Sequence, residues 1–193
     1  MDYKALLGAV AVAITFAAYV PYIRWTLRGD IKPHVFSWVI WGSATVVVGL
    51  AQLADDGGPG GWAILISGCI SLGIAALCWV KRGDVSITAS DWSFLVAAMT
   101  SLPVWYLTAD PLWAVLILTL VDILGFGPTV RKAWNAPHTE SISFFSIFAL
   151  RNAVVVTALD NYSVTTVCFP ATVTVACAAM VTLLLARRRA VPA

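Results

Sequence analysis

Two charged residues interrupt long apolar stretches in the second half of the chain. Asp122 lies within residues 112–130 and Arg151 within residues 142–160, each about ten residues from one end of its stretch. Stretches of this kind span a membrane as helices, and at ~1.5 Å per residue both charges would lie near its midplane. Each charge costs roughly 2.5 to 3.5 kcal/mol there, so we expect the two side chains to face the protein interior as a pair.

An aspartate and an arginine inside a membrane protein support two kinds of chemistry. Asp122 would take up and release a proton when its surroundings dry or when a solute occupies its partner. Arg151 would bind a carboxylate or phosphate of a solute, because bidentate geometry suits its guanidinium. The alternative is a permanent structural ion pair that locks the two stretches together. Asn152 is expected either to line the same cavity or to hydrogen-bond between helices.

A pattern of proline, arginine and serine occurs twice, about 107 residues apart. The members of the two copies are Pro21, Arg24 and Ser37, and then Pro128, Arg131 and Ser143. Pro21 and Pro128 each remove a backbone hydrogen bond from an apolar stretch, so we expect them to act as hinges or in specialised packing. A repeated span, turn and span is typical of a transporter built from two halves around one central site.

The repeat also predicts which residues of the first half lie near that site. The repeat offset places Thr15 at the position of Asp122 and Thr45 at the position of Arg151. We therefore expect both threonines to line the central cavity, so that one half is charged where the other is merely polar.

Trp41 and Gln52 are further candidates. Trp41 shares a helix face with Trp38 and is expected to wall the cavity, with helix packing or lipid contact as the alternative. Gln52 lies near the end of its apolar stretch, where it either meets water or joins the site. Most other tryptophans lie near stretch ends, which is typical of the aromatic belts of membrane proteins.

The composition excludes a water-soluble globular protein. Hydrophobic residues make up 60% of the 193 residues and charged residues 11%, against about 45 to 50% apolar residues in a soluble domain. The apolar stretches predict seven membrane-spanning helices and an all-α fold. Their bounds are 5–23, 35–54, 62–80, 92–109, 112–130, 142–160 and 165–186. The glycine-rich segment 57–61 is expected to be a flexible connection.

Basic and acidic residues alternate between the two ends of these stretches. The basic residues are Arg24, Arg28, Lys32, Lys81, Arg82, Arg131, Lys132 and Arg187 to Arg189. The acidic residues at the opposite ends are Asp55, Asp56, Asp110 and Asp160. The positive-inside rule then places the N-terminus outside the plasma membrane and the C-terminus in the cytoplasm. The basic side faces anionic lipid, and a net charge of +2 gives no reason to expect a nucleic-acid partner.

The predicted helices divide the chain into two repeats and one connecting span. Residues 1–82 would form a first triple-helix bundle, residues 83–110 a linker helix, and residues 111–193 a second triple-helix bundle with a basic tail. Three spans reverse the direction of the chain, so two halves of like orientation need an odd number of connecting spans. The halves are therefore predicted to be parallel repeats, in a 3+1+3 arrangement about an axis along the membrane normal.

The sequence around the two prolines resembles the PQ-loop superfamily, which contains the SWEET sugar transporters, the cystinosin-like amino-acid transporters and the KDEL receptor. The resemblance rests on a proline near the end of one span, a short basic turn, and Thr-Glu-Ser-Ile-Ser at residues 139–143. It covers both three-helix halves. The chain is also similar to bacterial membrane proteins of unassigned function that share the pattern from Asp122 to Ser141. The resemblance implies the seven-helix SWEET arrangement and a proton-coupling role for Asp122.

Two departures from the family pattern bear on the solute. Tyr22 and Thr129 follow the two prolines where the family name expects glutamine. The stretches 62–80 and 165–186 contain no asparagine, the residue type that SWEETs present to sugar there. Together with the aspartate and the arginine, this favours an anionic or zwitterionic solute over a neutral sugar.

These observations favour a secondary transporter that moves a small anionic or zwitterionic solute by alternating access. A SWEET-like sugar facilitator and a non-transporting receptor or scaffold of the same fold are the alternatives. We expect no enzyme, because the two histidines, His34 and His138, lie at helix starts and no nucleophile lies beside a base. Neither a metal ion nor a cofactor is expected. The expected partners are a small-molecule solute and membrane lipids, and the protein would be a monomer or a homo-oligomer.

Overall fold

The structure is a computed structural model that describes residues 3–28, 35–81, 89–135, 137–139 and 141–190, apart from some side chains within these ranges. The α-helices in these ranges are α1 (Tyr3–Arg28), α2 (Val35–Ala54), α3 (Gly58–Val80), α4 (Ala89–Thr108), α5 (Pro111–Asn135), α6 (Ile142–Thr157) and α7 (Val164–Ala190). A 3₁₀ turn, η1 (Pro137–Thr139), precedes α6. Each predicted apolar stretch coincides with one of these helices, which confirms the prediction of an all-α chain.

Three helices are long and apolar enough to cross a membrane. They are α1, α3 and α7, with mean hydropathies of 2.0, 2.3 and 2.1 over their most apolar windows. Shorter apolar segments occur in the other four helices, at Trp38–Ala54, Leu95–Thr108, Pro111–Leu124 and Ile142–Thr157. Three helices of the described residues therefore have the length and composition of membrane spans.

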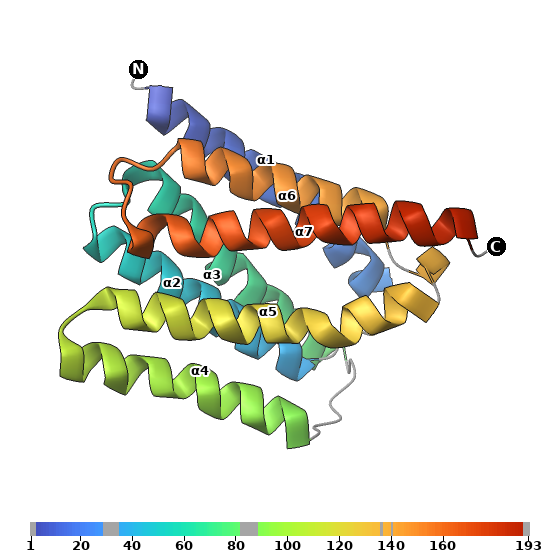
Figure 1. Cartoon of the computed structure of the whole chain (residues 1–193), viewed down its shortest axis with the longest axis horizontal. Helices are drawn as coiled ribbons and strands as arrows, with labels where there is room; N and C mark the ends of the chain where they lie inside the picture. Colours follow the sequence, from blue (N-terminus) through green and yellow to red (C-terminus); the bar gives the residue numbers. More distant parts are fainter. Residues whose placement is uncertain (1–2, 29–34, 82–88, 136, 140, 191–193) are drawn as a thin grey trace.

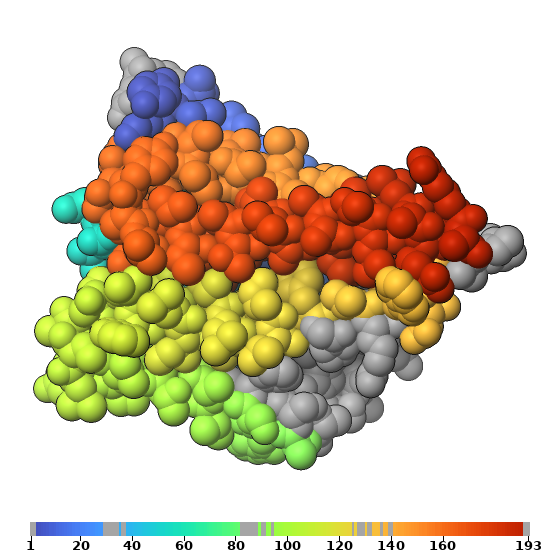
Figure 2. All heavy atoms as spheres, in the orientation of Figure 1, coloured from blue at the N-terminus to red at the C-terminus, as the bar shows by residue number. Residues whose placement is uncertain are grey.

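Six of the helices form a closed ring. Around the ring, α5 packs on α7, α7 on α6, α6 on α1, α1 on α3, α3 on α2, and α2 on α5. Helix α4 packs outside the ring against α5 and α2. Figures 1 and 2 show one broad face of the molecule, on which α4, α5, α7 and α6 follow one another. We refer to α1–α3 as the first helix group and to α5–α7 as the second helix group.

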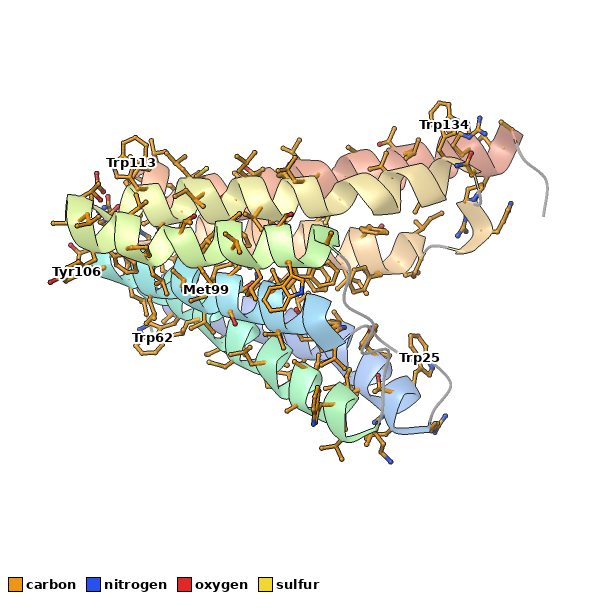
Figure 3. The ribbon with its side chains drawn as sticks, turned by 90° about the horizontal axis from the view of Figure 1, so that it is seen from below. Trp25, Trp62, Met99, Tyr106, Trp113 and Trp134 are labelled. Carbon is orange, nitrogen blue, oxygen red and sulfur yellow. The ribbon has the colours of Figure 1, made fainter. Side chains whose placement is uncertain are left out.

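The two ends of the helices carry opposite charges, and the chain termini lie at opposite ends (Figure 1). The end formed around Asp55, Asp56, Asp110 and Asp160 is called the acidic end, and the end formed around Arg24, Arg28, Lys81 and Arg187–Arg189 is called the basic end. Figure 3 shows that the two helix groups diverge toward the basic end. Exposed aromatic residues gather at both ends: Trp62, Tyr106 and Trp113 at the acidic end, and Trp25 and Trp134 at the basic end (Figure 3).

Local sequence explains where some helices begin and how closely they pack. Ser141 caps α6, since its side chain accepts a hydrogen bond from the backbone N–H of Phe144 at 3.2 Å. Helices α2 and α3 approach closely because glycines face the contact. A Cβ atom on Gly49 would lie 2.7 Å from the Cα of Leu65 on α3. The first helix group is therefore held by tight backbone packing between α2 and α3.

Candidate functional site

Arg151 lies at the interface between the two helix groups. Its side chain is 3% exposed and extends from α6 toward α1 and α3. Nε donates to Oγ1 of Thr15 on α1 at 3.1 Å, and Nη2 donates to the backbone carbonyl of Ala63 on α3 at 2.8 Å. Nη1 donates to Oδ1 of Asn152 at 3.0 Å. Arg151 therefore links three helices through three neutral acceptors.

The side chains around Arg151 are fixed by hydrogen bonds to their own helices. Oγ1 of Thr15 donates to the carbonyl of Ala11 at 2.9 Å. Nδ2 of Asn152 donates to the carbonyl of Phe148 at 2.9 Å. Both side chains are buried. The structure thus brings Thr15, Arg151 and Asn152 together and holds the guanidinium in one orientation.

Asp122 is not the partner of Arg151. The predicted ion pair is wrong: between described residues the structure has an ion pair at Lys4 and Asp160, but none between Asp122 and Arg151. The reason is the order of helices around the ring, in which α7 lies between α5 and α6. Arg151 uses the face of α6 that meets α1 and α3. Equal predicted depth in a membrane does not bring two side chains together when another helix separates them.

Asp122 lies in apolar surroundings on the side of α5 that faces α7. It is half-buried and close enough to Cys177 of α7 to interact with it electrostatically. It has no hydrogen bond or ion pair with any residue that the structure describes. One helical turn earlier, Thr119 is buried, and its Oγ1 also lacks a hydrogen-bond partner in the described part of the chain. Two polar side chains one helical turn apart on α5 thus lack a hydrogen-bond partner among the described residues.

An aromatic cluster borders the Arg151 site on the side of the basic end. Tyr19 follows Thr15 by one helical turn, and its ring centroid lies 5.5 Å from that of Phe148 on α6 and 5.9 Å from that of Trp38 on α2. Its hydroxyl lies 3.1 Å from Oγ of Ser71 on α3. The three aromatic side chains come from three helices. They therefore fill the space between these helices next to the guanidinium of Arg151.

Thr45 and Trp41 do not contact Arg151. Trp41 is 41% exposed, and its ring packs edge-to-face on Trp38 with a centroid distance of 6.0 Å. Thr45 is half-buried on α2, where its backbone lies against Gly68 of α3. The buried Trp38, rather than Trp41, is the tryptophan of α2 that reaches the aromatic cluster.

The two proline positions lie on helices. Pro21 is inside α1, which stays helical on both sides of it. Position 128 lies on α5, and the side chain of Pro128 is outside the described residues. The hinge role of both prolines stays a prediction.

A polar network joins the two helix groups at the acidic end, and it has no counterpart among the sequence predictions. Oγ of Ser163 donates to the carboxylate of Asp55. Nδ2 of Asn161 donates to the backbone carbonyl of Asp55 at 3.0 Å, and Nε2 of Gln52 donates to the carbonyl of Thr166 at 2.8 Å. Gln52 therefore does not meet water: it is 0% exposed and binds the start of α7. We call these five residues the acidic-end network.

Ser163 connects this network to the start of α7. The backbone N–H of Thr166 donates to Oγ of Ser163 at 3.2 Å, so Ser163 caps the helix in the usual way. A serine just before an apolar run predicts the cap at the start of a helix. Its second partner, Asp55, is 108 residues away, so no local pattern could have predicted the link.

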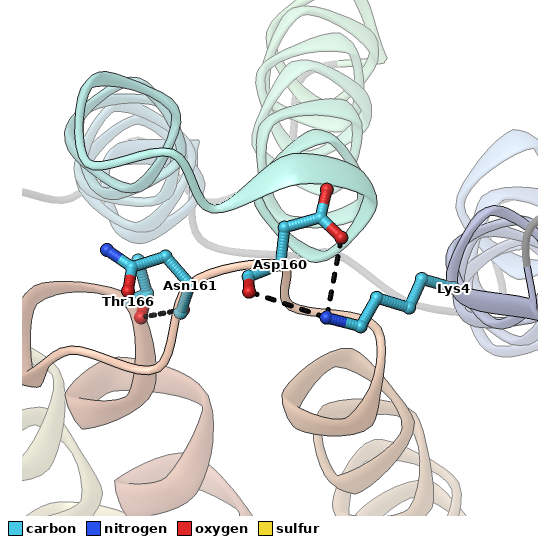
Figure 4. A network of polar contacts seen from close by, with 4 residues as sticks. All are labelled: Lys4, Asp160, Asn161 and Thr166. Atoms are coloured by element: carbon cyan, nitrogen blue, oxygen red, sulfur yellow. Dashed lines mark hydrogen bonds and ion pairs between the residues drawn. The ribbon is translucent and has the colours of Figure 1, made fainter.

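The glycine-rich segment 57–61 is packed rather than free, and from Gly58 on it forms the first turn of α3. The prediction of a flexible connection at 57–61 is wrong, because two backbone hydrogen bonds hold this segment to the α6–α7 turn. The N–H of Gly60 donates to the carbonyl of Ala158 at 3.1 Å, and the N–H of Asp160 donates to the carbonyl of Gly57 at 3.4 Å. Nearby, Nζ of Lys4 lies 3.5 Å from Oδ1 of Asp160 (Figure 4). The α2–α3 and α6–α7 turns thus close the acidic end together.

The described residues contain no cluster of three or more histidine, cysteine, aspartate or glutamate side chains that would hold a metal ion. A comparison of the chain with protein-family models, curated proteins and solved structures gives no match.

Proposed function

We propose that this chain is a secondary transporter of the plasma membrane that moves a small anionic or zwitterionic solute by alternating access. In this proposal all seven helices cross the membrane in a PQ-loop-like 3+1+3 arrangement. The acidic end faces outward with the N-terminus, and the basic end faces the cytoplasm with the C-terminus, as the positive-inside rule predicts. The proposal includes no enzymatic activity.

The packing of the ring supports two related halves. The two halves correspond if α1 is matched with α5, α2 with α6 and α3 with α7. Under this matching, each packing contact between the helix groups has an equivalent contact in the structure. Helix α1 packs on α6 as α2 packs on α5, and α3 packs on α6 as α2 packs on α7. Within each group the third helix lies between the first two. A pseudo-two-fold axis along the helices would produce this pattern.

The polar contacts between the helix groups are distributed unevenly, which supports alternating access. Between described residues, the hydrogen bonds that join the groups lie at the acidic end and at Arg151. The groups diverge toward the basic end (Figure 3). A transporter closed outside and open inside has this distribution, and rocking of one group against the other would exchange the two states.

The observation that carries the proposal is the buried cation at the contact between the groups. Arg151 is 3% exposed and has three neutral acceptors in place of a carboxylate. A buried charge without a counter-ion is costly, and charged residues within spans commonly mark solute pathways. Asp122 on α5 has no ion-pair partner among the described residues and is suited to carry the proton that drives uptake.

The test is uptake into liposomes that contain the purified full-length chain. A panel of small carboxylates, amino acids and neutral sugars is offered with and without an inward proton gradient. We expect gradient-dependent uptake of a carboxylate or zwitterion, and loss of the gradient dependence in Asp122→Asn. Asp56→Asn is the matched control, since Asp56 is exposed and asparagine tolerates its positive φ of 55°. Solute binding without flux would assign a receptor instead.

A further inference from the structure

The hydrogen bonds of Arg151 occupy a particular edge of its guanidinium. Nε and Nη2 lie on the same side of the planar group and form one of the two edges with which arginine binds a carboxylate in bidentate fashion. Thr15 and the carbonyl of Ala63 fill this edge, at 3.1 and 2.8 Å. Nη1 points to Asn152 at 3.0 Å, on its own helix. Both acceptors on the bidentate edge thus belong to the first helix group.

We propose that Arg151 binds the carboxylate of the transported solute by exchanging these two acceptors. The two carboxylate oxygens take the places of Thr15 Oγ1 and the Ala63 carbonyl, and Asn152 keeps the guanidinium in position. This inference rests on the transport function proposed above and specifies its solute as a carboxylate. Anion binding then removes the two hydrogen bonds through which Arg151 ties α6 to α1 and α3.

The charge of the incoming acceptor favours the exchange, and the desolvation of the carboxylate opposes it. The guanidinium already makes charge-assisted hydrogen bonds to its neutral acceptors, and a carboxylate adds the attraction between opposite charges to the same two bonds. The carboxylate also neutralises a cation that has no counter-ion among its hydrogen-bond partners. Tyr19 and Phe148 pack beside the site with centroids 5.5 Å apart, and this apolar border strengthens charge interactions by excluding water.

Releasing the two present acceptors leaves neither of them unsatisfied. Oγ1 of Thr15 keeps its hydrogen bond to the carbonyl of Ala11 at 2.9 Å. Ala63 lies inside α3, where its carbonyl is also in register for the helical bond from the residue four positions later. No buried polar group of the protein is therefore orphaned by the exchange, so its cost comes from the two bonds that the carboxylate replaces and from the desolvation of the carboxylate.

The experiment measures ligand-dependent thermal stability of the purified full-length protein in detergent. The probes are acetate, succinate and benzoate, each compared with its neutral amide at equal ionic strength, and orthophosphate. Four proteins are compared: wild type, Arg151→Gln, Thr15→Val and Thr15→Ser. We expect at least one carboxylate to raise the unfolding midpoint of wild type, its amide to have no effect, and Arg151→Gln to lose at least about tenfold in affinity.

Thr15→Val separates acceptor exchange from a purely structural role. Valine keeps the shape of threonine but cannot accept from Nε, so the carboxylate meets less competition. We expect carboxylate affinity to rise about fivefold, as when a hydrogen bond worth about 1 kcal/mol no longer competes. Thr15→Ser keeps the hydroxyl and should bind as wild type does. This arm remains informative even if Arg151→Gln does not fold.

The outcomes distinguish the inference from the function on which it rests. Unchanged carboxylate affinity in Thr15→Val, equal stabilisation of Arg151→Gln, or stabilisation by orthophosphate alone would overturn acceptor exchange. Proton-driven uptake of a neutral solute that persists in Arg151→Gln would overturn it as well while leaving a transporter. Carboxylate binding with the expected variant pattern but no flux in liposomes would support the exchange and refute transport.

Discussion

Replacing Gly58 with alanine should open the acidic end and destabilise the fold. Gly58 has a φ of +56°, and a Cβ atom there would overlap the carboxylate of Asp160. A left-handed conformation costs an alanine roughly 1 to 2 kcal/mol. Moving Asp160 also disturbs its N–H bond to Gly57 and its pairing with Lys4, although an exposed ion pair contributes little, about 0 to 1 kcal/mol. We expect a total loss of about 2 to 3 kcal/mol.

The assay is reversible unfolding of the purified protein in mixed micelles, supported by thermal melts. For a chain of this size the loss corresponds to a fall in the midpoint of roughly 5 to 10 °C. Gly73→Ala is the matched control on the same helix, because a Cβ atom at Gly73 meets nothing within 4 Å. That control should be neutral or more stable by up to about 1 kcal/mol, as expected for glycine to alanine in a helix.

A double variant divides the effect into its two causes. Asp160→Ala removes the colliding carboxylate, so Gly58→Ala combined with Asp160→Ala should retain the backbone strain and lose the collision. We expect Gly58→Ala to cost about 1 kcal/mol less in the Asp160→Ala background than in wild type. If Gly58→Ala is as stable as Gly73→Ala, the left-handed turn and its packing against the α6–α7 turn are refuted.

Three further outcomes follow from the same contacts. Ser163→Ala removes the cap of α7 and the partner of Asp55. We expect denaturant titration to show a loss of about 1 to 2 kcal/mol in the free energy of unfolding. An unchanged free energy would contradict the acidic-end network. Thr119→Val replaces a buried hydroxyl without a partner by a methyl group, so the same titration should show equal or greater stability. Asp122→Asn breaks no hydrogen bond of the described residues. Its free energy of unfolding should therefore lie within about 0.5 kcal/mol of wild type, while proton-driven uptake is lost. A large loss of stability would show that the carboxylate has a structural partner.

The sequence predicts the helices of this chain well because burial in lipid demands long apolar runs. The predicted stretch 35–54 has the same bounds as α2, and Ser141 caps α6 at the serine-rich start of that span. Arg151 was found for the same reason, since a charge within an apolar run is easy to detect. These features depend on the composition of one segment and on its neighbours in sequence.

The partners of Arg151 and the closure of the acidic end depend on which helices are neighbours. Depth alone suggested Asp122, but α7 separates the two helices and the nearest acceptors are a threonine and a backbone carbonyl. A carbonyl such as that of Ala63 leaves no mark in the sequence. Gln52 was ambiguous for the same reason: whether a polar residue near a helix end meets water depends on what packs above it.

The separation of Asp122 from Arg151 bears on the proposed transport cycle. Arg151 contacts Thr15 and the carbonyl of Ala63 in the first helix group, whereas Asp122 lies on the side of α5 that faces Cys177 of α7. The buried cation and the carboxylate thus lie at different helix contacts. Side by side the two charges would neutralise each other and exclude ligands. In the proposed transport cycle Arg151 would bind the carboxylate of the solute and Asp122 would take up a proton, and a monocarboxylate that enters with one proton moves no net charge.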